Sequence, residues 1–334
     1  IDANQVVNVL RHPEERVPDD IHFVTTLGRL WALGTTFDWG QLWGEARRNR
    51  VVLPTYAFQQ SPYFIERIEA AGPAETLPEK VEALEEWGWR PRWRPRLADC
   101  LADVEAGDLG PPRTWLFFAD GAGLSDRAAA RLRAAGHHVV EVRPGDAFAQ
   151  AGEHAYVLAP EKGREGYDRL LADLLARGLA PDRIAHFWLV TADEAHRPGS
   201  SFFHRNQEQG FYALFFLAQA MAAENLPVAP HVTVVTSGAA QVRDEPLPYP
   251  DKATVAGPAR VIPRELPGVT CSMLDLALPG PAPKGRAGRA AREAEMARLE
   301  AQLLEELLAE PAERVAALRG ARRFEQEMAP LPLA

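Results

Sequence analysis

The sequence predicts an α/β fold in which a doubly wound parallel sheet follows an extended N-terminal segment and precedes a C-terminal helix plus hairpin. From about residue 113, short runs rich in Val, Leu and Phe alternate with longer segments of helical periodicity. Such alternation is typical of parallel strands that helices cover on both faces. The 334 residues also exceed the length at which single cores usually stop growing, so we expect one large or two modest domains.

The elements of the predicted sheet can be placed in chain order. We expect strands at Thr114–Ala119, His138–Val142, Ile184–Thr191, His231–Ser237 and Val269–Leu276. We expect helices at Ser125–Ala135, Arg164–Ala176 and His204–Ala223. The last helix is apolar nearly all round, with Phe211, Leu214 and Phe215 on one face and Tyr212 and Phe216 on others. It is therefore predicted to be buried or to lie at an interface.

Two further elements complete the predicted unit. Apolar residues at helical spacing form a stripe that ends before Pro311, namely Met296, Leu299, Leu303 and Leu307. Charged residues separate them, which predicts a surface helix with one buried face. The segments Arg314–Leu318 and Arg322–Gln326 flank the turn Arg319-Gly320-Ala321 and predict a hairpin.

The residues before the sheet fall into three segments. We divide the chain into the ranges 1–40, 41–70, 71–112 and 113–330. In the first segment, apolar residues share one helical face, namely Phe23, Leu27, Leu30 and Trp31. The second is predicted to be an extended strap, because Pro54 disfavours helix at Leu53. The third is interpreted as a connector whose Trp87, Trp89 and Trp93 anchor it to the domain that follows.

The composition excludes several classes of function. A formal net charge of −9 repels phosphate backbones, so nucleic acid is not an expected partner. No apolar run approaches the roughly 20 residues that span a bilayer, so no membrane is expected. Cys100 and Cys271 have neither disulfide-framework nor metal-site spacing, which fits a reducing cytoplasm. The chain opens at Ile1 without a targeting signal, so we expect an internal piece of a longer cytoplasmic protein.

The turn after the first strand of the sheet has an incomplete nucleotide-binding pattern. Gly121-Ala-Gly-Leu-Ser-Asp126 has an aspartate where the dinucleotide fingerprint requires its third glycine. We expect Ser125 to cap the following helix and Asp126 to supply the negative charge that its N-terminus attracts. A second anion about 4 Å away would be repelled by roughly 4 kcal/mol at an effective dielectric of 20. The sequence therefore predicts a structural turn with no bound cofactor.

Three residues suggest a reductase but lack its spacing. Short-chain reductases polarise a carbonyl with Ser and Tyr while a Lys lowers the pKa of the Tyr, and Ser237, Tyr249 and Lys252 match these types. In that family the Lys follows the Tyr by four positions on one helix face, whereas here Lys252 follows Tyr249 by three positions. Prolines at 246, 248 and 250 also disfavour a helix through Tyr249. We interpret the segment as a proline-rich loop.

The remaining polar residues point to structure rather than chemistry. The histidines of the sheet region, His137, His138, His186, His204 and His231, lie in or beside predicted strands and helices. No Gly-x-Ser-x-Gly nucleophile elbow exists to give them a serine partner. The segment Ser200–Glu208 could be a ligand loop or the capped start of the long helix, and we favour the cap.

Several stretches resemble a known family. Residues 51–66, VVLPTYAFQQSPYFIE, resemble the post-acyltransferase linker of modular type I polyketide synthases, usually LPTYPFQRxRYWIE. Four positions depart from that form, Ala57, Gln60, Ser61 and Phe64. The segment from Val6 to Trp39 resembles the end of the acyltransferase domain of these synthases. Residues 113–278 are similar to the structural subdomain of their ketoreductases, and RVAALRGARRFEQEMAP at 314–330 is similar to the hairpin before the catalytic half.

The resemblance implies a scaffold. The structural subdomain in this family is a truncated Rossmann-like sheet that holds no cofactor, and no catalytic, cofactor-binding or metal-binding residue carries over to this chain. The implied function is to support the catalytic ketoreductase half. The implied partners are the other domains of the same synthase, namely ketosynthase-acyltransferase, catalytic ketoreductase half and acyl carrier protein, within a parent that is typically a homodimer.

Three alternatives remain open. One is an active NADPH-dependent reductase that uses Ser237, Tyr249 and Lys252. Another is a docking module in which the aromatic stretch 200–216 contacts an acyl carrier protein or another partner. A third, within the same family, is a pseudo-ketoreductase beside an inserted methyltransferase.

Overall fold

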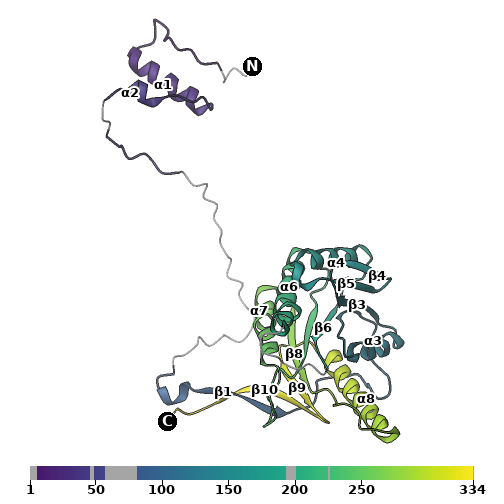
Figure 1. Ribbon diagram of the computed structural model, residues 1–334. Coiled ribbons are helices and arrows are strands. Elements are labelled where there is room, and N and C mark those ends of the chain that lie inside the picture. Colours follow the sequence, from purple (N-terminus) through teal and green to yellow (C-terminus); the bar gives the residue numbers. More distant parts are fainter. Residues whose placement is uncertain (1–5, 46–48, 57–80, 193–200, 225, 334) are drawn as a thin grey trace. The chain divides into compact units, whose positions relative to one another are not determined.

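The structure is a computed structural model that describes residues 6–45, 49–56, 81–192, 201–224 and 226–333. The chain forms two compact units, Ile1–Leu77 and Pro78–Ala334 (Figure 1). In the first unit, helix α1 (Asp19–Ala32) is followed by the short helix α2 (Trp39–Trp43). Phe23 and Trp31 of α1 are exposed although they belong to the predicted apolar face. Of the predicted strap, residues 57–70 lie outside the described part, and residues 51–56 form neither helix nor strand.

The second unit contains one ten-stranded sheet. Its strands are β1 (Trp89–Pro95), β2 (Thr114–Phe118), β3 (His138–Pro144), β4 (Ala149–Gly152), β5 (Ala155–Leu158), β6 (Arg183–Leu189), β7 (His231–Ser237), β8 (Thr270–Leu276), β9 (Val315–Arg319) and β10 (Arg322–Pro330). They lie in the order β1-β10-β9-β8-β7-β6-β2-β3-β5-β4. The seven strands from β9 to β5 are mutually parallel, and β10, β1 and β4 add antiparallel edges.

The order of the parallel strands is that of a doubly wound nucleotide-binding fold. Read in chain order, β5-β3-β2-β6-β7-β8 corresponds to the arrangement 3-2-1-4-5-6. One helix of that arrangement is replaced, because β3 leads to β5 through the short antiparallel strand β4. The predicted α/β fold with a truncated Rossmann-like sheet is confirmed, and this replacement is where the truncation lies.

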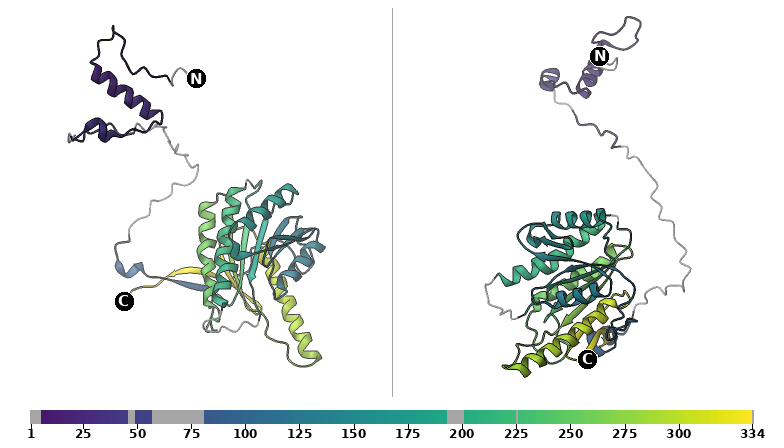
Figure 2. Two further views of the ribbon diagram at one scale, coloured as in Figure 1. Left: turned by 45° about the horizontal axis from the view of Figure 1, so that its top comes forward. Right: turned by 90° about the vertical axis from the view of Figure 1, so that its right-hand side faces the viewer.

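Helices cover both faces of the sheet (Figure 2). They are α3 (Leu124–Ala134), α4 (Glu165–Ala176), α5 (Phe202–Asn206), the π-helical segment η4 (Gln207–Tyr212), α6 (Ala213–Ala223), α7 (Ala256–Glu265) and α8 (Arg286–Leu308), with 3-10 turns η2 (Leu84–Trp87), η3 (Pro160–Lys162) and η5 (Pro250–Val255). Buried side chains of α4, α6 and α7 form one core with the sheet, and those of α3 and α8 form a second core on the opposite face.

The long helix differs from its prediction in geometry and in burial. It runs from Phe202 to Ala223 but changes to π-helical geometry over η4. Gly210 lies in this segment so close to the sheet that an added Cβ would approach Leu189 Cδ1 to 2.7 Å. Leu214 is buried as expected, whereas Tyr212 and Phe215 are exposed. The helix therefore buries one side only, and its aromatic outer side faces solvent.

The C-terminal predictions hold in the structure. The stripe Met296, Leu299, Leu303 and Leu307 is buried along α8, as its spacing predicted. The predicted hairpin is β9–β10, and β10 extends four residues beyond the predicted end at Gln326. Strand β1 lies within the predicted connector 71–112 and pairs with β10 along its whole length.

Candidate functional site

In doubly wound sheets, ligands bind in the crevice outside the carboxyl ends of the strands, where the strand order reverses. In this chain the reversal lies between β2 and β6. Two polar centres border that edge. One follows β2, and the other is built from the residues that follow β6, β7, β8 and β9.

The turn after β2 is filled by the side chain of Asp120. This residue is buried, and its carboxylate accepts hydrogen bonds from the backbone N–H groups of Ala122 (2.6 Å), Leu124 (3.3 Å) and Ser125 (2.7 Å). The N–H of Asp120 in turn donates to Ser125 Oγ at 3.1 Å. Helix N-termini bind phosphates through these same N–H groups and the positive end of the helix dipole. A carboxylate of the chain itself therefore occupies the position that a phosphate would need.

The roles predicted for Ser125 and Asp126 in this turn are wrong, because Asp120 accepts the hydrogen bonds of the helix N-terminus. Ser125 is not the cap, because Gly123 precedes the helix at φ 86° and Ser125 lies inside it. Asp126 lies in the first turn, but its carboxylate pairs with Arg143 rather than with the N–H groups of the helix. Arg143 also donates to the carbonyl oxygen of Asp120 at 3.1 Å. The residues present thus do not fit a dinucleotide phosphate at this turn.

The second centre contains a cavity of about 290 Å³. Its lining residues come from the loops after β6, β7 and β8 and from the end of β9, and they include Thr191, Ser237, Tyr249, Leu276 and Arg319. Prolines at 246, 248, 279 and 281 form part of its wall. The cavity therefore lies on the side of the crevice remote from Asp120, at the ends of strands that are fully buried along their length.

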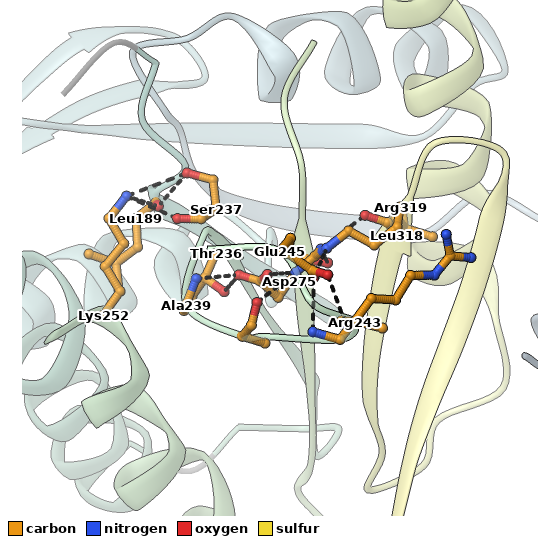
Figure 3. A network of polar contacts seen from close by, with 12 residues as sticks. Leu189, Thr236, Ser237, Ala239, Arg243, Glu245, Lys252, Asp275, Leu318 and Arg319 are labelled. Carbon is orange, nitrogen blue, oxygen red and sulfur yellow. Dashed lines mark hydrogen bonds and ion pairs between the residues drawn. The ribbon is translucent and has the colours of Figure 1, made fainter. Parts of the chain in front are cut away.

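Lys252 contacts two residues of the cavity lining, Thr191 and Ser237, and its side chain is fully buried (Figure 3). Its ammonium donates to Leu189 O (3.0 Å), Ser237 O (3.3 Å), Ser237 Oγ (3.4 Å) and Thr191 Oγ1. These acceptors stand at the ends of β6 and β7, whereas Lys252 belongs to η5. The lysine therefore joins two strand ends to the turn that precedes α7.

The structure brings together the three residues of the reductase alternative. Tyr249 comes directly before η5, and Lys252 Nζ lies 4.3 Å from the centre of its ring. Residues 246–249 form a loop, as interpreted, and Lys252 lies in the 3-10 turn η5 that follows it. Ser237 Oγ is buried, accepts from Thr191 N at 3.0 Å and lies 3.3 Å from Leu189 O. The printed hydrogen bonds of Lys252 and Ser237 thus go to backbone groups of the strand ends and to the hydroxyls of Thr191 and Ser237.

An ion-pair network holds the other side of the cavity (Figure 3). Arg319 donates to Asp275 Oδ2 (2.7 Å), Glu245 Oε1 (3.0 Å) and Ala240 O (2.8 Å). Asp275 also accepts from Thr236 Oγ1 at 2.7 Å. Burial opposes ionisation of Glu245, but hydrogen bonds from Val242 N–H and from Arg319 lower its pKa to about 2. Glu245 is therefore ionised at neutral pH, and the network fixes the loop after β7 to β8 and β9.

Two buried histidines are neutral structural groups. Burial lowers the pKa of His186 to about 3, and its ring packs between Phe118 and Trp188. Burial, with the charges of Arg183 and Arg314, lowers the pKa of His231 to about 3. The ring nitrogens of His231 lie 2.7 Å from Thr270 Oγ1 and 3.0 Å from Ser272 Oγ, across the sheet.

The described residues contain neither a candidate metal site nor a helix that could cross a membrane. They contain no group of three or more His, Cys, Asp or Glu side chains that could hold a metal ion. None of the described helices is long and apolar enough to cross a membrane. Of the segment Ser200–Glu208, the part from Ser201 is described and begins the long helix at Phe202 without a capping hydrogen bond from the Ser201 side chain.

Comparisons with known proteins link the chain to polyketide synthases. A family model described as β-ketoacyl synthase-like, N-terminal, matches residues 119–281. The chain is 29% identical over 261 residues to the pikromycin polyketide synthase component PikAII of Streptomyces venezuelae, covering 76% of this chain and 6% of that protein. Component PikAIII of the same organism is 32% identical over 81 residues, 24% of this chain and 4% of that protein. The chain is thus similar to components of modular polyketide synthases. It spans 4% to 6% of the length of these two relatives.

Solved structures share the fold of this chain. An adenylation, ketoreductase and pseudo-Asub multidomain structure of a keto acid-selecting NRPS module matches with a TM-score of 0.60 at 23% identity, covering 76% of this chain and 19% of that chain. An N-terminal ketoreductase from a macrolactin assembly line matches with a TM-score of 0.52 at 15% identity, covering 74% and 45%. The chain therefore has the Rossmann-like fold of these structures.

Sequence reasoning missed Asp120 and Arg319 as the groups that organise this edge. Asp120 follows a buried strand and precedes Gly121-Ala-Gly, and an Asp a few residues before a helix is a capping signal that could have identified it. Arg319 was assigned to a hairpin turn, and nothing in its local sequence indicates that Glu245 and Asp275 converge on it.

Proposed function

We propose that the second unit is a non-catalytic structural part of a modular polyketide synthase that supports the catalytic half of a ketoreductase. The observation that carries this proposal is the position of Asp120, whose carboxylate takes up the N–H groups that a nucleotide phosphate would require. The hydrogen bonds of Lys252 support it, because a lysine committed to strand ends stabilises the fold rather than a bound substrate.

The finer assignments belong to the same proposal. Residues 1–40 are the end of an acyltransferase, 41–70 the post-acyltransferase linker, 71–112 a connector and 113–330 the structural subdomain. No residue of the chain binds a cofactor or metal or acts in catalysis. The partners are the other domains of the same cytoplasmic synthase, a homodimer. A pseudo-ketoreductase beside an inserted methyltransferase is the variant of this proposal in which the supported half is inactive.

Calorimetric titration of the chain with NADPH tests the proposal. We expect no binding heat up to about 1 mM NADPH, a limit that corresponds to roughly 4 kcal/mol of affinity. An active short-chain reductase titrated under the same conditions is the positive control. Micromolar binding by this chain would overturn the proposal, because the nucleotide would then have displaced or bypassed Asp120.

The second candidate is an NADPH-dependent reductase. Ser237 and Tyr249 line one cavity and Lys252 contacts both residues, which favours this candidate. Turnover of a diffusible β-ketothioester with NADPH is the test. Turnover that disappears in Tyr249→Phe would establish the reductase. Absence of turnover in a folded protein would support the structural role.

The third candidate is the docking module at 200–216. The exposed aromatic side of the long helix favours it, since Phe203, Tyr212 and Phe215 are each 43% to 48% exposed. Pull-down of acyl carrier protein with wild type and Phe215→Asp tests this candidate. Equal retention by both proteins would remove it.

A further inference from the structure

The strands β1 and β10 form a two-stranded ribbon that extends beyond the rest of the sheet. β10 pairs with β9 only over Arg322–Glu325, while it pairs with β1 from Phe324 to Pro330. Gln326–Pro330 and Trp89–Trp93 therefore pair only with each other. This outer part of the ribbon projects from the body of the second unit (Figures 1 and 2).

The ribbon has one apolar and one basic face. Side chains alternate along a strand, so Trp89, Pro91, Trp93 and Pro95 share one face and Arg90, Arg92 and Arg94 the other. Trp93 lines a cavity of about 170 Å³ together with Ala256 and Arg260 of α7. Its face is therefore the α7 side of the sheet, and the arginine row lies on the opposite side.

The arginine row is only partly neutralised. Arg94 pairs with Glu327, and Arg96, which continues the row, pairs with Glu325. Arg90 and Arg92 are exposed, and no described carboxylate lies within 4.0 Å of either guanidinium. Residues 88–96 and 322–330 contain six arginines and two glutamates, whereas the chain as a whole carries a net charge of −9. The ribbon is thus a positive region on an acidic protein.

The outer edge of β1 is closed to strand addition. Arg96 N–H donates to Arg323 O and Leu331 N–H donates to Gly88 O, so the N–H groups of Arg90, Arg92 and Arg94 also point toward β10. The outward positions are 89, 91, 93 and 95, and two of these are prolines, which have no N–H. A partner must therefore use the side chains of the ribbon rather than its backbone.

The spacing of the row matches one kind of acidic surface. Alternate residues of an antiparallel strand lie about 6.8 Å apart, because each residue rises about 3.4 Å. Residues four apart on an α-helix lie about 6 Å apart along the axis. An acidic helix with carboxylates every fourth residue, laid along β1, would therefore place one carboxylate near each arginine. A nucleic acid fits less well, because the net charge of −9 repels a long polyanion.

We propose that the arginine row Arg90-Arg92-Arg94-Arg96 is a docking surface for a protein partner that presents an acidic helix. This inference does not depend on the absence of nucleotide binding, since the ribbon lies at the opposite edge of the sheet from β3 and β5. Long-range attraction would speed encounter, and the contacts of Arg90 and Arg92 would fix the register.

The test measures binding of a fluorescein-labelled helical peptide with glutamate at every fourth position, by anisotropy at low salt. The variant Arg90→Glu/Arg92→Glu leaves the Arg94 and Arg96 ion pairs in place. We expect it to bind the peptide at least tenfold more weakly than wild type. Arg289→Glu/Arg298→Glu makes the same change in charge at exposed positions of α8 and is expected to bind within twofold of wild type.

Additional controls separate a specific contact from an effect of net charge. Circular dichroism must show that both double variants are folded, and Arg90→Lys/Arg92→Lys is expected to retain binding within about threefold. A peptide with glutamine in place of glutamate is expected not to bind. Equal losses in the two glutamate variants would overturn the proposal, since net charge alone would explain them. Absence of peptide binding, or tighter binding of an oligothymidylate than of the peptide, would overturn it as well.

Discussion

Asp120 and Lys252 close the two ends of the same crevice with opposite charges. Asp120 is an anion held by N–H groups at a helix N-terminus, and Lys252 is a cation held by oxygens at strand carboxyl ends. Each ion binds the groups that the fold leaves unsatisfied at that place. The difference is that the N–H groups at the β2–α3 turn bind the Asp120 carboxylate, whereas a cavity of about 290 Å³ lies next to Ser237, a partner of Lys252.

The two places differ in what they would do to a ligand. At the turn after β2, the negative charge of Asp120 would repel a phosphate group, and its side chain would take up the space. The cavity near Lys252 has space for a ligand. Ion pairs of Arg319 hold its wall, so a ligand would have to bind without breaking them. Substitutions of these buried polar groups measure how much each group stabilises the fold.

Replacing Lys252 by methionine is expected to have the largest effect. The substitution removes the lysine donor from Leu189 O, Ser237 O and Thr191 Oγ1, and a buried polar group that loses its partner costs roughly 1–3 kcal/mol. We therefore expect a loss of about 3–5 kcal/mol of unfolding free energy for these acceptors together. Urea denaturation measures it as a lower unfolding midpoint.

The matched control for this substitution is Lys284→Met, because Lys284 is exposed. We expect the control to change the free energy of unfolding by less than about 0.5 kcal/mol. If Lys252→Met were as stable as the control, Lys252 would not act as a structural link, and the comparison with Asp120 would fail.

Asp120→Ala is expected to cost about 2–4 kcal/mol of unfolding free energy. Three buried N–H groups lose a charged acceptor, and bonds to charged groups contribute roughly 1.5–3 kcal/mol each in favourable cases. Asp120→Asn keeps one acceptor oxygen and should lose about half as much. Asp244→Asn, an exposed aspartate, is the control. An Asp120→Ala protein with wild-type stability would show that the turn is not held by this carboxylate.

The sequence predicted the parallel sheet well because its strands are continuous apolar runs. It missed β5 and α7, and it assigned β1 to a connector. β1 contains Pro91 and Pro95, which argue against a strand when read locally, yet both lie where no N–H is needed. The π-helical segment was not predictable either, since it accompanies a close approach of Gly210 to Leu189 that only the tertiary structure creates.

The sequence predicted a negative charge at the candidate site, but not the residue that carries it. An anion at the β2–α3 turn followed from the altered glycine pattern, but Asp126 was chosen because it occupies the fingerprint position. Asp120 lies just after the end of β2, and its carboxylate accepts hydrogen bonds from N–H groups at the start of α3. The ion pairs of Arg319 join residues 44 and 74 positions apart, and sequence periodicity contains no information on such contacts.

The buried histidines predict a loss of stability below about pH 6.5. Each has a folded pKa of about 3 and an unfolded pKa near 6.5, so between these values only the unfolded chain binds the proton. Stability therefore falls as pH falls, by about 1.4 kcal/mol per pH unit for each histidine. We expect His231→Gln to remove one such contribution when urea unfolding at pH 6.5 and pH 5.5 is compared. His204→Gln, at an exposed position, should leave the slope unchanged, and an equal slope in all three proteins would contradict the assignment.

Glu245→Gln is expected to have the smallest effect, about 1 kcal/mol at pH 7, because Glu245 is partly exposed and solvent screens its pair with Arg319. The pKa of Glu245 is about 2 in the folded state and near 4.3 when unfolded, so its stabilisation is present above about pH 4.3 and is lost as pH falls toward 2. Urea midpoints of wild type and Glu245→Gln should therefore differ at pH 7 and converge by about pH 2. Glu265→Gln, at an exposed position, is the control. A difference that persists unchanged at about pH 2 would mean that the glutamine disturbs packing, and that the loop after β7 is not held by charge as Asp120 holds the turn after β2.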